Sequence, residues 1–236
     1  MTNPNILLVA CAKDEAAYLP EWIFYHLLIG IKSIHVYINN NSDNSLNILD
    51  RIASHYPVSY TVADSLIEID PKNFEHRTNK NFLDRNPVQS KCYIDAYDNV
   101  NQNHFSHIAY LDIDEFLHPA STLKALVLPE SGIKPDIVKI QWLNLTGDRE
   151  PFTLLNKTKK GVLDTSHKSI VRTGITDLKI DDPHTCSIKG NTGELSRKGL
   201  ILHRMLRSRK EYLYLLARST TEKDDILTNG FKKNRR

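Results

Sequence analysis

The stretch that most constrains the fold lies at residues 108–117, where the sequence reads IAYLDIDEFL. Its first four residues are apolar, as in a buried β-strand. Asp112 and Asp114 then stand two positions apart. In an extended backbone, side chains at i and i+2 point the same way, so we expect these two carboxylates to converge while Glu115 faces elsewhere. Two ionised carboxylates repel each other unless a proton or cation lies between them, which predicts a divalent cation site.

The chain before this stretch alternates apolar runs with amphipathic segments. Residues 5–12 form a continuous apolar run, as expected of a strand buried on both faces, and residues 33–38 and 58–62 are predicted as two further strands. Apolar residues recur at helical spacing in three further segments, at residues 19–29, 46–53 and 93–100. This alternation predicts an α/β fold with a mainly parallel central sheet flanked by helices. We also expect strands at residues 136–143, 169–172 and 200–203, and an irregular polar loop at residues 64–88.

Polar residues stand where the predicted strands end. Asp14 follows the first strand, and Asn39 and Asp43 follow the second. The carboxyl ends of parallel strands meet at one edge of a sheet, where α/β proteins bind their ligands. We therefore predict that Asp14, Asn39 and Asp112 lie at one edge and line a single site. The competing explanation is local, because Asp and Asn also form turns and cap helices.

Charge is distributed unevenly along the chain. The formal net charge is +3, but residues 201–236 carry ten Lys or Arg and four Asp or Glu, a net of +6, which leaves −3 for the remainder. Such a tail either touches an anionic surface such as a membrane or is a disordered solubilising segment, and the sequence leaves both explanations open. The body of the chain has no basic nucleic-acid signature, so we expect no nucleic-acid partner.

Length, cysteine usage and hydropathy indicate an intracellular globular protein. The chain has 236 residues, 40% of them hydrophobic, which is enough for a sizeable core. Its three cysteines are far apart and form no C-x-x-C pair, which favours a reducing compartment. No run approaches the ~18 apolar residues of a membrane-spanning helix, and the first residues do not read as a secretory leader. We therefore expect a cytoplasmic protein.

Short motifs along the chain occur in an order typical of one enzyme group. The opening reads KDEAAYLPEWIFYH at residues 13–26, and the turn after the second strand reads YINNNSD at residues 37–43. Gln89 then stands ahead of the helix that leads to LDIDEFL. The later elements are KSIVR at residues 168–172 and His203 followed by R-S at residues 207–208. In this order the motifs resemble those of family-2-like and family-92-like glycosyltransferases over nearly the whole chain.

This resemblance implies a fold and an activity. The fold implied is the A-type glycosyltransferase fold of nucleotide-diphospho-sugar transferases, as a single domain over residues 1–236. Its expected parts are a nucleotide-sugar-binding half at 5–118, an acceptor-binding half at 119–210 and a basic C-terminal helix or tail at 211–236. The activity implied is metal-dependent transfer of a hexose from a UDP-sugar to a glycan or glycolipid. The expected setting is the inner face of the membrane, in the synthesis of cell-surface polysaccharide or lipopolysaccharide.

The resemblance also implies roles for motif residues. Asp112, Asp114 and His203 are the expected ligands of Mn²⁺ or Mg²⁺, with His184 as a second candidate histidine, although either histidine also fits a hydrogen-bonded core residue. Contacts to the nucleotide sugar are expected from Asp14, Asn39, Asp43, Gln89, Asp112, Lys168 and Arg172. Lys168, Arg172 or Arg204 would add charge-assisted bonds to the phosphates, whose negative charge grows as the nucleoside diphosphate leaves.

The catalytic base is expected on the acceptor side. An inverting transfer needs a base on the face of the sugar opposite the leaving phosphate, so a metal-bound carboxylate is excluded. The first carboxylates after the predicted strand at 136–143 are Asp148 and Glu150. Pro151 biases Glu150 towards an extended conformation, so we predict Glu150 first and Asp148 second. Asp181 and Asp182 are the remaining options.

Two other classes of protein share parts of this pattern. A phosphohydrolase of the D-x-D type also places two aspartates after an apolar strand, but it requires Thr or Val where this chain has Phe116. A non-catalytic nucleotide- or carbohydrate-binding module on the same fold stays open. Slow hydrolysis of the donor without acceptor would distinguish a transferase from such a module.

Overall fold

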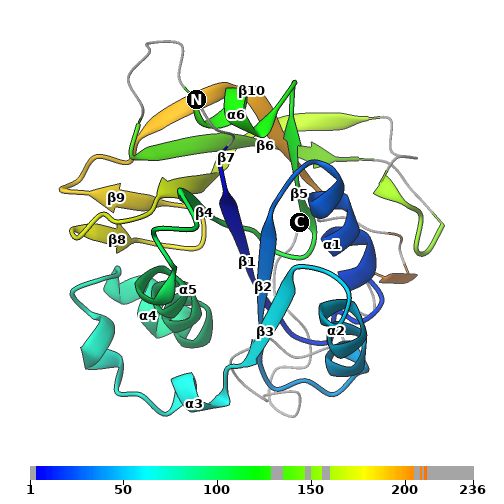
Figure 1. Cartoon of the computed structure of the whole chain (residues 1–236), viewed down its shortest axis with the longest axis horizontal. Helices are drawn as coiled ribbons and strands as arrows, with labels where there is room; N and C mark the ends of the chain where they lie inside the picture. Colours follow the sequence, from blue (N-terminus) through cyan, green and yellow to red (C-terminus); the bar gives the residue numbers. More distant parts are fainter. Residues whose placement is uncertain are drawn as a thin grey trace.

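The computed structural model describes residues 4–128, 135–146, 150–155, 160–204, 208 and 210–211. Strands and helices alternate along the first half, as the sequence predicts (Figure 1). The strands are β1 (Ile6–Ala12), β2 (Ser33–Ile38), β3 (Val58–Val62), β4 (His107–Tyr110), β5 (Glu115–Pro119), β6 (Ile137–Leu145), β7 (Gly161–Arg172), β8 (Leu178–Ile180), β9 (Cys186–Ile188) and β10 (Glu194–His203). The helices are α1 (Leu19–Leu28), α2 (Ser45–Ala53), α3 (Asp64–Ile67), α4 (Lys80–Arg85), α5 (Pro87–Asn99) and α6 (Leu123–Val127), with a 3₁₀ turn, η1, at Pro71–Phe74.

One eight-stranded sheet organises the chain, in the order β3-β2-β1-β4-β7-β6-β10-β5. The first four of these strands are mutually parallel, and β6 is parallel to β10. β7 runs antiparallel to both of its neighbours, and β5 runs antiparallel to β10. The predicted mainly parallel sheet is therefore confirmed. A separate hairpin is formed by β8 and β9.

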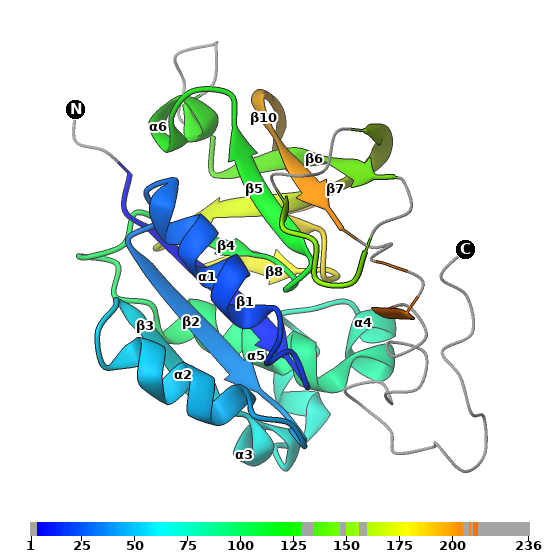
Figure 2. The ribbon, with the colours of Figure 1, turned by 90° about the vertical axis from the view of Figure 1, so that its right-hand side faces the viewer.

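Helices cover both faces of the sheet, as predicted. In Figures 1 and 2, α1 and α2 lie over one face of the β1–β3 region, and α4 and α5 lie over the other. β1 is buried on both sides because its residues alternate between two cores, with Leu8 and Ala10 in one and Val9 in the other. Within the described residues, no helix is long and apolar enough to cross a membrane.

The expectation of an irregular loop at residues 64–88 is wrong. This segment contains α3, η1, α4 and the start of α5. Asp70 and Asn79 each accept a bond from the backbone N–H two residues later, which caps η1 and α4. The buried Lys91 of α5 donates to the carbonyls of Ile67 and Ile69, at 2.9 and 2.6 Å. Short capped turns fastened to α5 carry too little periodicity to be recognised from sequence.

The sequence predicts no element at residues 115–119, where the structure forms β5. It forms the edge of the sheet and pairs only with β10 among the described strands. Two side chains of α1 hydrogen-bond to backbone groups of β5 on the edge away from β10. Trp22 Nε1 donates to the Glu115 carbonyl at 2.8 Å, and His26 Nε2 accepts from the Leu117 N–H at 3.1 Å. Trp22 and His26 also belong to the core, since both are fully buried.

Candidate functional site

The carboxyl ends of β1, β2 and β4 meet at one edge of the sheet. β1 is parallel to β2 and to β4, so Asp14, Asn39 and Asp112 all follow strands that end on the same side. Two of these strand ends carry non-glycine residues with positive φ, namely Asp14 at 52° and Asn40 at 43°. Such backbone is uncommon and concentrates at functional sites. The predicted placement of the three strand ends at one edge is thus what the structure shows.

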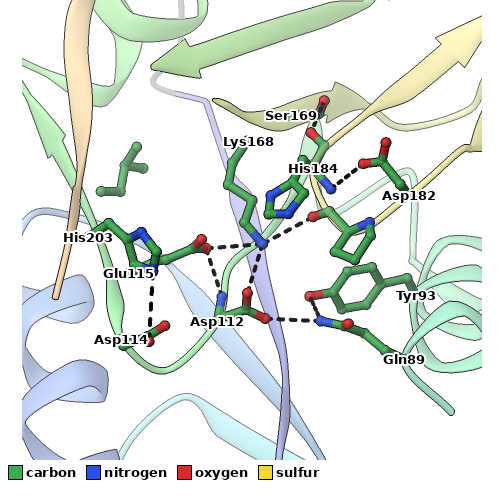
Figure 3. A network of polar contacts seen from close by, with 12 residues as sticks. Gln89, Tyr93, Asp112, Asp114, Glu115, Lys168, Ser169, Asp182, His184 and His203 are labelled. Carbon is green, nitrogen blue, oxygen red and sulfur yellow. Dashed lines mark hydrogen bonds and ion pairs between the residues drawn. The ribbon is translucent and has the colours of Figure 1, made fainter. Parts of the chain in front are cut away.

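The acidic stretch itself is a turn and not a continuation of β4. The Asp112 carbonyl accepts a bond from Glu115 N–H at 3.0 Å, and Glu115 Oε2 accepts one from Asp112 N–H at 2.9 Å. The i, i+2 strand geometry expected for Asp112 and Asp114 is therefore wrong. The chain reverses here because it leaves β4 to join the far edge of the sheet as β5. Glu115 does not face elsewhere. Its side chain lies in a cluster of charged groups with Asp112 and Lys168 (Figure 3).

Lys168 is the counter-ion of this acidic turn. Its Nζ lies 3.1 Å from Asp112 Oδ2, 3.1 Å from Glu115 Oε2 and 3.0 Å from the Pro183 carbonyl (Figure 3). An ammonium group has three N–H donors, and each has a partner here. Lys168 is 1% exposed. It therefore neutralises the acids from within and has no donor left for a phosphate, contrary to the role expected for it.

The charges of this cluster depend on one another. Burial raises the pKa of Glu115 to about 7, although the attraction of Lys168 works against the rise. Burial alone would lower the pKa of Lys168, but the attraction of Asp112 and Glu115 outweighs it and raises that pKa. One cation thus serves two carboxylates, and Glu115, which is fully buried, is the acid that most readily keeps a proton.

Asp112 is held from its other side by α5. Gln89 Nε2 donates to Asp112 Oδ1 at 2.9 Å and to Tyr93 Oη at 3.0 Å. Both carboxylate oxygens of Asp112 therefore accept a bond, one from Gln89 and one from Lys168. The side chain nevertheless stays 35% exposed. Each oxygen has a further lone pair, so Asp112 can still accept a hydrogen bond from a hydroxyl group of a ligand at the sheet edge.

Asp114 faces a different partner from Asp112. His203 Nε2, at the end of β10, lies 3.8 Å from Asp114 Oδ2, which is an ionic contact and too long for a hydrogen bond. Burial would lower the pKa of His203, but the interaction with Asp114 outweighs it and raises that pKa. The two aspartates thus divide between Lys168 with Gln89 on one side and His203 on the other.

The structure allows a test of the predicted metal site. Among the described residues, no three His, Cys, Asp or Glu side chains are grouped so that they could hold one ion. Asp114 and His203 do fit a divalent cation, because ligand atoms about 2.0–2.2 Å from one ion can stand 3.8 Å apart. Asp112 already has Lys168 as its cation. His184 packs against Trp142 with 4.9 Å between ring centroids, and burial lowers its pKa to about 4.

Asp14 and Asp43 brace two strand-end loops against each other. Asp14 Oδ1 accepts from the backbone N–H groups of Ser42 and Asp43, at 2.6 and 3.1 Å. Asp43 Oδ2 accepts from Ala16 N–H at 2.8 Å, and its Oδ1 caps α2 through Ser45. The local explanation that the sequence left open is therefore visible for Asp43, through Ser45, whereas these bonds of Asp14 reach residues 28 and 29 positions away. A contact between either side chain and the nucleotide sugar remains a prediction. The same holds for the buried Asn39.

Arg172 and Arg204 do not join the cluster. Arg172 ends β7 and pairs with His107, the first residue of β4, so it lies at the opposite end of β4 from the acidic turn, and its guanidinium contacts Asp136 at 2.5 Å. Arg204 is buried and bonds Glu21 of α1 at 2.7 Å, with a second bond to the Thr153 carbonyl at 2.9 Å. A role in phosphate binding, which the sequence suggested for both, is not supported by these positions.

The predicted bases fall on the loop after β6. Glu150 is exposed, and its carbonyl accepts from Thr153. That loop is tied to the acidic turn by Arg204, whose side chain donates to the Thr153 carbonyl and whose backbone N–H donates to the Asp114 carbonyl at 2.8 Å. Asp148 lies outside the described residues. Asp182 Oδ1 accepts the backbone N–H groups of His184 and Thr185, so it shapes a turn.

Sequence reasoning missed two participants, Glu115 and Tyr93. The position of Glu115 directly after D-x-D was visible, but its direction depended on the turn. Tyr93 was read only as a helix-face residue, yet its hydroxyl meets the Gln89 amide. The i, i+4 spacing of Gln89 and Tyr93 on α5 is the signal that could have found this contact.

Comparison with known proteins bears on the family. No family model matches the chain. It is 26% identical over 133 residues to a curated glycosyltransferase family 92 protein of Oryza sativa subsp. japonica, a match that covers 55% of this chain. The same match covers 19% of the rice protein, so this chain spans about a fifth of the length of its curated relative.

Several solved structures are similar in shape at low identity. The S. aureus TarS fragment 1–349 has a TM-score of 0.47 at 10% identity, covering 84% of this chain and 60% of that one. Its complex with UDP has a TM-score of 0.46 at 12% identity with the same coverage. HddC from Yersinia pseudotuberculosis has a TM-score of 0.41 at 12% identity, covering 88% and 96%. The sequence match with a family 92 protein confirms the predicted resemblance. In this respect the chain is glycosyltransferase-like.

Proposed function

We propose that this chain is a glycosyltransferase that moves a sugar from a nucleoside-diphosphate sugar to a glycan or glycolipid acceptor. A UDP-sugar is the proposed donor. The observation that carries the proposal is the acidic turn at the carboxyl edge of the sheet. Asp112 stands there 35% exposed and held by Gln89 and Lys168, beside the Asp114–His203 pair. Ligands of α/β proteins bind at this edge.

The proposal includes a divalent cation, Mn²⁺ or Mg²⁺. Asp114 and His203 would hold it, since they supply one carboxylate and one imidazole on the same side of the turn. Such an ion, when bound, offsets the negative charge that develops on the leaving phosphate. Lys168 neutralises Asp112 and Glu115 without contacting the ligand, which keeps the buried acids compatible with an anionic donor nearby.

The proposed reaction is a single inverting displacement. The bond between the anomeric carbon and the phosphate oxygen breaks while the acceptor oxygen bonds to that carbon from the opposite face. The acceptor proton passes to a carboxylate of the loop after β6, with Glu150 as first candidate and Asp148 as second. Asp112 would orient the donor through hydroxyl groups of the ribose or the sugar.

The proposed setting is the inner face of a membrane, where the acceptor of a cell-surface polysaccharide or lipopolysaccharide is built. The support is the basic C-terminal segment, whose net charge over residues 201–236 is +6. Basic segments attract anionic lipid headgroups by about 1 kcal/mol per Lys or Arg near the surface.

A thermal-shift panel tests the proposal. Nucleotide sugars are added with and without Mn²⁺, and a ligand at 100 times its Kd should stabilise the protein by about 2.7 kcal/mol. We expect one nucleotide sugar to raise the Tm more with Mn²⁺ than without it. His203→Gln should lose the Mn²⁺-dependent part of the rise in Tm. His55→Gln should keep it, because His55 is exposed and far from His203 in sequence.

Two results would change the conclusion. If no nucleotide sugar raises the Tm, with or without metal, the proposed function is wrong. If a nucleotide sugar binds but is neither hydrolysed nor transferred, the chain is instead a binding module on this fold.

A further inference from the structure

Asn144 links His203, the partner of Asp114, to the Asp164 carboxylate of β7. It lies on β6, between β7 and β10 in the sheet, and its backbone is in register with His203. Its Nδ2 donates to Asp164 Oδ2 at 2.7 Å, and its Oδ1 lies 3.0 Å from His203 Nδ1. Neither Asn144 nor Asp164 belongs to any motif considered in the sequence.

The hydrogen bonds determine which way the Asn144 amide points. Ser166 N–H donates to Asp164 Oδ1 at 2.8 Å, which lowers the pKa of Asp164 and keeps it ionised. An ionised carboxylate only accepts hydrogen bonds, so the amide nitrogen of Asn144 must face it. The opposite orientation would set the amide oxygen against a carboxylate oxygen. The amide oxygen therefore faces His203.

This orientation selects one tautomer of His203. An amide oxygen is an acceptor, so the neutral ring must carry its proton on Nδ1 and donate it to Asn144. The lone pair is then on Nε2, the atom that faces Asp114 Oδ2 at 3.8 Å. The ring is also held in place by Trp142, with ring centroids 4.1 Å apart, and His203 is 5% exposed.

We propose that Asn144, backed by Asp164, is a positioning residue that fixes His203 as the Nδ1–H tautomer and so presents Nε2 to a divalent cation shared with Asp114. This inference rests on the proposed function for the cation but not for the tautomer. Partners that orient a metal-ligating histidine in this way typically change metal affinity about 10–100-fold when removed.

The chain offers a matched control on the same strand. Gln141 also donates from its side-chain amide to residue 164, at 2.8 Å, but to the backbone carbonyl and not to the carboxylate. Gln141→Leu therefore removes a hydrogen bond between β6 and β7 without touching the link to His203. Comparing Asn144→Leu with Gln141→Leu separates the loss of positioning from a general loosening of the two strands.

Nitrogen NMR of the protein with isotope-labelled histidine is the first test. Spectra are taken at alkaline pH, where imidazole rings are neutral, and the His203 signal is identified by its loss in His203→Gln. Wild type should show His203 as Nδ1–H, and Asn144→Leu should shift it towards Nε2–H while Gln141→Leu does not. Nε2–H in the wild type would overturn the inference, and that measurement does not depend on the folding of Asn144→Leu.

Binding of Mn²⁺ with UDP, followed by electron paramagnetic resonance, is the second test. Asn144→Leu should weaken Mn²⁺ about 10–100-fold, and Gln141→Leu should leave it unchanged. Equal weakening in both variants would overturn the positioning role. If wild type binds no Mn²⁺ while His203 is the Nδ1–H tautomer, the proposed metal-dependent function fails and the assignment of the tautomer by Asn144 stands.

Discussion

At the scale of single residues, the acidic turn depends on Lys168. Its ammonium group is fully surrounded by Asp112, Glu115 and the Pro183 carbonyl, and it is the cation that the structure places between those two acids. A buried ion pair adds little over an apolar alternative, but removing one partner leaves an uncompensated buried charge. The effect of losing Lys168 is therefore expected to exceed that of losing a surface lysine.

Lys168→Met should lower the free energy of unfolding by about 3–5 kcal/mol, because it leaves Glu115 buried without its counter-ion. Urea denaturation measures this change. The control is Lys139→Met, because Lys139 Nζ donates to the neutral hydroxyl of Thr192, at 3.3 Å. Adding Glu115→Gln to Lys168→Met should recover part of the loss. Equal effects of Lys168→Met and Lys139→Met would contradict the counter-ion role.

Glu150→Gln tests the proposed base. General-base catalysis is typically worth about 10²–10⁴-fold, so turnover should fall by that factor while the Kd of the donor stays near the wild-type value. Steady-state rates and donor titration measure the two quantities. Asp148→Asn is the comparison. Near wild-type turnover in both variants would place the base elsewhere, and product with retained anomeric configuration would refute the inverting scheme.

At the scale of elements, side chains of α1 make the hydrogen bonds to β5 that a further neighbouring strand would otherwise make. The outer backbone groups of an edge strand need partners when they are buried. Trp22 and His26, one turn apart on α1, bond the Glu115 carbonyl and the Leu117 N–H. His26 Nδ1 lies 2.8 Å from the Trp22 carbonyl, so the ring donates from Nδ1 and accepts at Nε2. The ring must therefore be neutral in the folded state.

This requirement predicts a loss of stability in acid. Burial lowers the pKa of His26 to about 3, against an ordinary value of about 6.5. Between those values the unfolded chain binds a proton that the folded chain excludes. The contribution of His26 to the free energy of unfolding is thus fully present above about pH 6.5 and is lost as the pH falls towards 3. At about pH 5 the loss from this group is about 2 kcal/mol.

Urea denaturation at about pH 7 and about pH 5 checks the prediction. His26→Gln should show a smaller decrease between the two pH values than wild type does. His55→Gln is the control, because His55 is exposed. If His26→Gln and wild type lose the same stability on acidification, His26 is not the group responsible.

At the scale of the whole molecule, one continuous sheet joins the two halves that the sequence predicted. β4 ends the parallel part, and β7 crosses beside it in the opposite direction, so Lys168 arrives next to the acidic turn. The division into a donor half and an acceptor half stays a prediction. So does the role of the basic C-terminal segment, which lies outside the described residues beyond position 211.

Removing residues 229–236 should weaken binding to anionic vesicles. The removed segment carries Lys232, Lys233, Arg235 and Arg236, each worth about 1 kcal/mol near an anionic surface. Co-sedimentation with phosphatidylserine vesicles measures the binding, with phosphatidylcholine vesicles as the neutral control. High salt should weaken binding of the full chain, because it screens these charges. Equal sedimentation of the full and shortened chains would refute membrane docking by this tail.

The sequence by itself determined the elements of the first half and the edge at which they end. Apolar runs and helical spacing are local properties, so β1, β2, β3, α1 and α2 lie close to where they were predicted. The direction of parallel strands then placed Asp14, Asn39 and Asp112 together without knowledge of any contact. The motif order also identified the glycosyltransferase resemblance, because order along the chain is contained in the sequence.

Only the tertiary structure decided which charged groups meet. Lys168 and Asp112 are 56 positions apart, and their contact exists because β7 inserts antiparallel between β4 and β6. Glu115 turned inward because the chain reverses to form β5 instead of extending β4. Arg172, four residues after Lys168, lies beside the start of β4 and so away from the acidic turn that follows β4. Long-range strand pairing sets all three outcomes, and no local pattern encodes that pairing.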